Sequence, residues 1–188
     1  MAYLWSNGMV QMHIPKTGGK WVRKTMEATG HKIVRDVAGG HEPAPVLLNT
    51  PAFVFVRHPA TWLASWWAHC QRHGFQKLKA LPANYEEDNV FGKMQSFTSL
   101  HMAKDFPSFV IAVLADKHNY VTDFFDAFTS VADHVGKQES LKDDLERFVG
   151  PVADFDPFNV ADNLPNISPA IRSIVAHHED LTRYDYKP

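Results

Sequence analysis

The chain has 188 residues, 45% of them hydrophobic and 21% charged, and a formal net charge of −2. This is the composition of a soluble globular protein, so we expect a single domain over residues 1–188 with a sizeable core. The charge gives no reason to expect nucleic-acid binding, and the lack of any run of about 18 apolar residues argues against a membrane span. Cys70 is the only cysteine, which excludes an internal disulfide and, with no secretory-signal pattern at the N-terminus, favours a cytoplasmic protein.

A pair of glycines marks the first informative stretch. Residues 9–12 predict the end of a buried strand, and residues 21–28 have the apolar spacing of a helix. Gly18 and Gly19 lie between them, shortly after Lys16. A helix start leaves backbone N–H groups unpaired, its dipole is positive there, and glycines let an anion come close to the main chain. The stretch therefore predicts a phosphate-binding loop, with an ordinary tight turn and a solvated lysine as the alternative.

This loop departs from the Walker A pattern of nucleotide-hydrolysing proteins. That pattern needs a glycine five residues before Gly19, where the chain has Ile14, and a Ser or Thr directly after the lysine, where Lys20 is followed by Trp21. The missing hydroxyl is the group that would hold Mg²⁺. We therefore expect an anion site without a metal.

A second strand-to-helix turn carries an arginine. Residues 53–56 are apolar and predict a buried strand, which delivers Arg57 to a helix that begins near Pro59 and contains Ser65. The guanidinium of Arg57 has a planar fork suited to phosphate, and Ser65 offers a small hydroxyl. The alternative is that Arg57 pairs with a carboxylate and Ser65 only packs.

These two turns together resemble the sulfotransferase family that uses 3′-phosphoadenosine-5′-phosphosulfate (PAPS). Residues 15–21, Pro-Lys-Thr-Gly-Gly-Lys-Trp after a strand, are similar to the family's 5′-phosphosulfate loop. The family holds the 3′-phosphate with an arginine at the end of a strand and a serine eight residues later, the spacing of Arg57 and Ser65. The resemblance implies an α/β fold, a three-layer sandwich with a mainly parallel central sheet like that of P-loop nucleotide kinases.

The resemblance also implies a set of residues that bind PAPS, or its product 3′-phosphoadenosine 5′-phosphate (PAP). Lys16 would in addition stabilise charge on the leaving phosphate, and Trp21 would stack against the adenine. Lys20 stands where the family commonly has Thr or Ser, so a charge replaces a hydroxyl. The implied cofactor-binding residues are Lys16, Thr17, Gly18, Gly19, Lys20, Trp21, Arg57 and Ser65.

A histidine between the two turns is the candidate catalytic base. Soluble members of the family place a histidine there, followed one residue later by proline, and His41-Glu42-Pro43 resembles that element. A neutral histidine suits a general base near pH 7, because its unperturbed pKa is about 6.5. Glu42 is the alternative base, since some branches of the family use a carboxylate.

The rest of the sequence does not identify the acceptor and does not exclude two alternative functions. Residues 74–105 have no clear period, and we expect acceptor specificity there because variable loops usually select substrates. The expected acceptor is a small molecule or carbohydrate with a hydroxyl or amine. Residues 134–145 resemble the family's strand that leads into a helix, and the resemblance implies both elements here. The alternative functions are a small-molecule P-loop kinase, which would need ATP and Mg²⁺, and a catalytically silent nucleotide-binding module.

Overall fold

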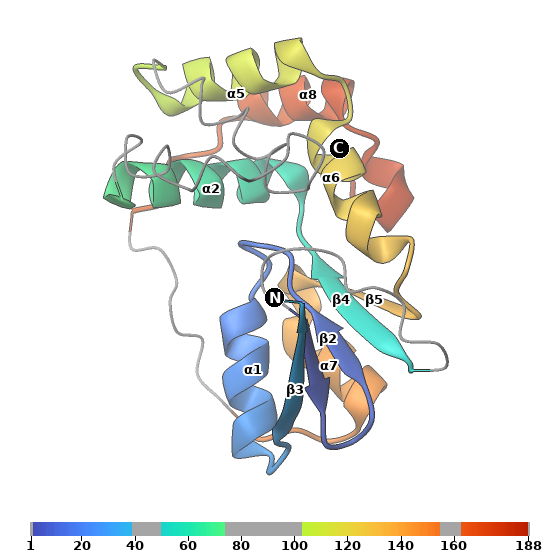
Figure 1. The fold of residues 1–188 in the computed structure, drawn as a ribbon. Coiled ribbons are helices and arrows are strands. Elements are labelled where there is room, and N and C mark those ends of the chain that lie inside the picture. Colours follow the sequence, from blue (N-terminus) through green and yellow to red (C-terminus); the bar gives the residue numbers. More distant parts are fainter. Residues whose placement is uncertain (1, 39–49, 74–102, 155–162, 188) are drawn as a thin grey trace. The chain divides into compact units, whose positions relative to one another are not determined.

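The computed structural model describes residues 2–38, 50–73, 103–154 and 163–187, and Figure 1 shows their fold. The chain divides into two compact units. The first unit comprises residues 1–57 and 125–160, and the second comprises residues 58–124 and 161–188. The described residues form an α/β structure with a five-stranded sheet and six α-helices.

The sheet belongs to the first unit and is mixed. The strand order is β3-β1-β2-β4-β5, with β2–β4 and β4–β5 parallel and with β1 antiparallel to both of its neighbours. Four strands therefore run in one direction and β1 runs in the other. The strands are β1 (Ala2–Trp5), β2 (Val10–Met12), β3 (Ile33–Ala38), β4 (Ala52–Val56) and β5 (His134–Lys137).

The reversed strand β1 makes the sheet mixed, with two parallel and two antiparallel strand pairs. A short turn connects it to β2, and in that turn the Trp5 amide donates to the Met9 carbonyl at 2.9 Å. Gly8 has the left-handed φ of 82° that this turn requires, and the Asn7 side chain accepts from the Met9 amide at 3.2 Å. Two strands joined by so short a turn pair antiparallel, because parallel pairing needs a long crossover.

One apolar cluster holds the first unit together. The helices α1 (Gly19–Ala28) and α7 (Leu141–Val149) both contribute to it. Phe53 and Phe55 are alternate residues of β4 and share one face of the sheet, where their rings lie 6.0 and 5.8 Å from that of Phe148. The buried members of the cluster are Tyr3, Trp5, Met9, Trp21, Val22, Met26, Phe53, Phe55 and Leu145.

The expected strand and helix near residue 140 are confirmed, and a buried carboxylate joins them. The strand β5 runs through the short 3₁₀ helix η1 (Gln138–Ser140) into α7. Asp144, which is 5% exposed, accepts hydrogen bonds from the Lys137 amide and the Ser140 hydroxyl, both at 2.7 Å. It also pairs with Arg147 at 2.9 Å. This side chain fixes the turn between β5 and α7.

The second unit is helical. Its helices α2, α5 and α8 contact one another. Two of them begin with a side-chain cap: Asp105 accepts from the Ser108 amide at 2.8 Å, and Ser168 accepts from the Ile171 amide at 3.3 Å. None of the helices within the described ranges is long and apolar enough to span a bilayer. The helices are α2 (Pro59–His73), α5 (Phe106–Asp116), α8 (Pro169–His178) and, shared between the units, α6 (Tyr120–Thr129).

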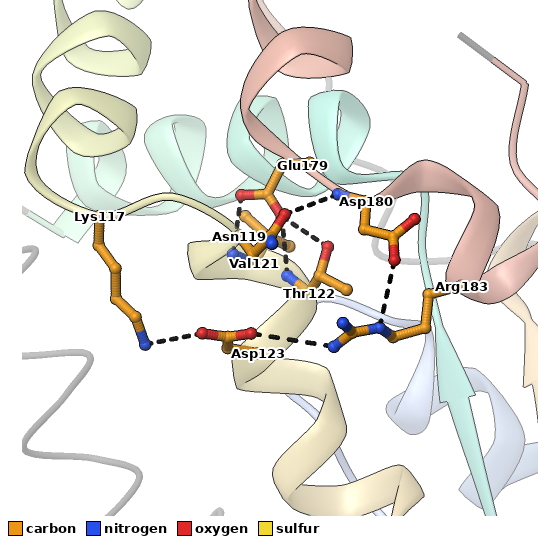
Figure 2. Close-up of polar contacts among 8 residues, drawn as sticks. All are labelled: Lys117, Asn119, Val121, Thr122, Asp123, Glu179, Asp180 and Arg183. Atoms are coloured by element: carbon orange, nitrogen blue, oxygen red, sulfur yellow. Dashed lines mark hydrogen bonds and ion pairs between the residues drawn. The ribbon is translucent and has the colours of Figure 1, made fainter.

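A buried glutamate connects the end of α8 to the start of α6 (Figure 2). The Glu179 carboxylate accepts from the Val121 and Thr122 amides, both at 2.9 Å, and from the Thr122 hydroxyl at 2.6 Å. These amides belong to the first turn of α6, where the helix itself supplies no acceptor. Glu179 therefore acts as a helix cap that reaches α6 from a distant part of the sequence.

Candidate phosphate-binding site

The predicted glycine loop connects β2 to α1. Gly18 is the N-cap of α1, with φ 89°, and Lys16 has φ 68°, a left-handed value that is uncommon for a residue with a side chain. The Thr17 hydroxyl donates to the Ile14 carbonyl at 2.8 Å and closes the loop from within. Because a glycine N-cap has no side chain, it offers no side-chain acceptor to the first turn of α1, and the Trp21 amide donates to the Gly18 carbonyl at 2.8 Å instead.

Close packing explains both glycines. A Cβ atom on Gly19 would lie 2.2 Å from Cδ2 of His13, and one on Gly18 would lie 2.7 Å from a methyl group of Leu141. The imidazole of His13 is 9% exposed and lies directly against the first residue of α1. The Gln11 side-chain amide donates to the Gly19 carbonyl at 3.3 Å. The loop backbone is therefore enclosed by side chains from β2 and α7.

Arg57 reaches this loop. It follows β4, which lies parallel to and beside β2, so the loop and the arginine lie at the same edge of the sheet. Nη1 of Arg57 donates to the Lys16 carbonyl at 3.2 Å. Two segments 41 residues apart in sequence thus meet at one hydrogen bond.

The charges around the loop favour an anion. Lys16 is half-buried, Lys20 is exposed and Arg57 is half-buried, and the first turn of α1 has no acidic residue. The nearest acidic side chain on α1 is that of Glu27, in its last turn, where it pairs with Arg23 at 3.0 Å. Positive side chains therefore add to the positive end of the helix dipole at the same place.

Two of the predicted site residues have structural roles in the described fold. Thr17 is 1% exposed and its hydroxyl is bonded within the loop. Trp21 is 9% exposed and belongs to the apolar cluster of the first unit. Packing in the core accounts for Trp21 without a ligand, and its stacking against adenine stays a prediction.

The remaining predicted residues lie apart from the loop or outside the described residues. Ser65 is buried in α2 and belongs to the second unit, so its pairing with Arg57 stays a prediction. His41 and Glu42 lie outside the described residues, as do residues 74–102 of the expected acceptor region. Within the described ranges, no group of three or more His, Cys, Asp or Glu side chains could hold a metal ion.

The sequence reasoning missed the side chains that pack against the loop. Two adjacent glycines at a strand-to-helix turn indicate that something lies close to the backbone, but His13 and Leu141 could not be selected from the pattern alone. His13 had one usable signal, since it directly follows β2 and precedes the loop.

No family model, curated protein or solved structure matches this chain.

Proposed function

We propose that the chain is a PAPS-dependent sulfotransferase that acts on a hydroxyl or amine of a small-molecule or carbohydrate acceptor. The observation that carries this proposal is the hydrogen bond between Arg57 and the carbonyl of Lys16. This bond connects the glycine loop, residues 15–21, to the turn that carries Arg57, and these are the two motifs on which the resemblance is based. The proposal includes the three-layer, P-loop-like arrangement of the family and a cytoplasmic location.

Two features of the loop support the binding of a phosphosulfate group. The first turn of α1 carries no acidic residue, and the cationic residues Lys16, Lys20 and Arg57 belong to the loop, to the start of α1 and to the turn that contacts the loop. The residue after Lys20 is the buried Trp21, so no hydroxyl takes the place that holds Mg²⁺ in P-loop kinases. These features support an anion site that works without a metal.

In this proposal, residues of the chain bind PAPS, stabilise the leaving group and activate the acceptor. PAPS supplies an activated sulfuryl group and a phosphate leaving group. The first amides of α1 and the side chain of Lys16 bind the 5′ end, and Lys16 stabilises the negative charge that develops on the leaving oxygen. Arg57, together with Ser65, binds the 3′-phosphate. His41 removes the proton of the acceptor, with Glu42 as the alternative base.

Isothermal titration of the full chain with PAP tests the cofactor site without knowledge of the acceptor. We expect a dissociation constant in the micromolar range, a binding free energy of about −8 kcal/mol, and much weaker binding of ATP with Mg²⁺. Arg57→Ala should remove this preference. Arg57→Lys should restore little of it, because an ammonium cannot make a bidentate contact with phosphate.

Arg23→Ala is the matched control. Arg23 is an exposed arginine on α1 that pairs with Glu27, so its loss removes the same charge outside the loop and should leave PAP affinity nearly unchanged. A preference for ATP with Mg²⁺ would favour the kinase alternative. Tight PAP binding without sulfuryl transfer to any acceptor tested would favour the silent module, and binding of neither nucleotide would refute the site.

A further inference from the structure

Three histidines of the second unit gather where α8 ends. His177 and His178 are the last two residues of α8, and His118 lies in the turn between α5 and α6. The ring centroids of His118 and His178 are 4.8 Å apart, those of His177 and His178 are 5.1 Å apart, and those of His118 and His177 are 6.2 Å apart. We call these residues the histidine cluster. The proposed sulfotransferase chemistry uses none of them.

The buried nitrogen of His178 makes the cluster sensitive to protonation. Nδ1 of His178 is buried and has no hydrogen-bond partner among the described residues. A proton added there would find no acceptor in that part of the chain, and its charge would lie beside two further titratable rings. Burial, together with the rings of His118 and His177, lowers the pKa of His178. The folded state therefore favours the neutral ring.

The charged side chains near the cluster are engaged with other partners (Figure 2). Lys117, which precedes His118, pairs with Asp123 at 2.9 Å. Asp180 accepts from the Thr182 hydroxyl at 2.7 Å and lies 3.6 Å from Arg183. Glu179 is directed at the first turn of α6. The negative end of the α8 dipole would favour a cation at His178, whereas burial and the neighbouring rings lower the pKa of His178.

Hydrogen bonds beside the cluster hold the segment that follows α8. The Asn119 amide donates to the His178 carbonyl at 2.8 Å, and the Asn119 side chain accepts from the Asp180 amide at 2.8 Å. Glu179, between them, caps α6 through Val121 and Thr122. The backbone of residues 178–180 is therefore bound both to the turn that carries His118 and to the start of α6.

We propose that the histidine cluster is an acid-sensitive latch. When the rings are neutral they pack together and keep the segment after α8 bound to the turn and to α6. When His178 takes up a proton, an Nδ1–H and a positive charge are buried without an acceptor among the described residues, so the segment is released and the α6 amides lose their cap. The inference does not depend on the proposed sulfotransferase function.

The direction of the pH effect follows from linkage. Because the pKa of His178 is lowered in the folded state, its contribution to stability is present above the model value of 6.5 and is lost as the pH falls below it. Glu179 acts in the opposite direction, since burial raises its pKa above the model value of 4.5 and its protonation favours the folded state as the pH falls. Variants of the histidines are therefore needed to separate the two effects.

Hydrogen exchange at the Val121 and Thr122 amides measures the opening of the latch directly. We would follow these two amides by NMR in the full chain at pH 7.5 and 5.5, in buffer with EDTA so that metal does not compete with protons, and correct for intrinsic exchange. The opening constant should rise as the pH falls, by up to about tenfold per pH unit if one proton is taken up. In His178→Gln this rise should disappear.

Two further variants make the test decisive. His118→Gln removes a neighbouring ring at an exposed position and should reduce the rise even if His178→Gln fails to fold. His31→Gln is the matched control, because His31 lies in the first unit, and it should keep the full rise. An opening constant that is the same at both pH values in the native chain overturns the proposal. So does a rise that is unchanged in both cluster variants.

Discussion

Replacement of Gly19 by alanine tests the packing that shapes the candidate loop. The new Cβ would lie 2.2, 2.5 and 2.6 Å from Cδ2, Nε2 and Cγ of His13, so the imidazole or the helix start must move. His13 is buried, and overpacking of a buried site costs about 1–3 kcal/mol. The better helix propensity of alanine offsets at most about 1 kcal/mol. An approach of 2.2 Å belongs to the upper part of that range, about 2–3 kcal/mol, so we expect a net loss of stability of about 1–2 kcal/mol and the loss of PAP binding.

Urea unfolding and PAP titration of the same samples measure both effects. Gly30→Ala is the control, because it adds a methyl group with nothing within 4 Å and reports only the strain of φ 95°. His13→Ala combined with Gly19→Ala should be more stable than the sum of the single changes predicts, by about 1 kcal/mol. If Gly19→Ala is as stable as the native chain, or if the double variant shows no coupling, the reasoning about this contact is wrong.

Two further predictions concern buried carboxylates. Asp144→Ala should destabilise the chain by about 2–3 kcal/mol in urea unfolding, because the Lys137 amide loses the acceptor that Asp144 provides. The control is Asp143→Ala, at an exposed position, which should change stability by less than about 0.5 kcal/mol. Equal effects of the two changes would contradict the capping role of Asp144. Burial raises the pKa of Glu179, so its stabilising contribution is present at low pH and is lost as the pH rises through its folded-state pKa. The native chain should therefore be more stable than Glu179→Gln by a larger margin at pH 5 than at pH 7. Urea unfolding of both proteins at the two pH values measures this margin, and a larger margin at pH 7 would contradict the prediction.

The sequence predicted the parts of the site that depend on local pattern. Apolar residues followed by glycines located the turn between β2 and α1, and the run before Arg57 located β4. Because β2 and β4 are adjacent and parallel, Arg57, which follows β4, lies beside the loop that follows β2. The pattern could not predict which side chains enclose the glycines, because the contact between Gly18 and Leu141 joins residues more than a hundred positions apart. Packing of that kind is set by the whole fold.

The same limit applies to the antiparallel strand at the start of the chain. Residues 2–5 were not recognised as a strand, because a segment of four residues shows too little period to be distinguished from a loop. The result is the antiparallel strand β1 in a sheet that we expected to be mainly parallel. Trp21 belongs to the apolar cluster of the first unit, and its stacking against adenine stays a prediction.

Arg57 has a role in shaping the loop that is separate from any contact with a ligand. Lys16 holds a left-handed conformation, which costs a residue with a side chain about 1–2 kcal/mol, so other interactions must stabilise it. The hydrogen bond from Arg57 fixes the carbonyl of Lys16. Because a trans peptide is planar, the N–H of Thr17 must then point away from Arg57. One guanidinium thereby orients a loop amide and adds positive charge at the same edge of the sheet, which is why its replacement should affect both the shape of the loop and its affinity for an anion.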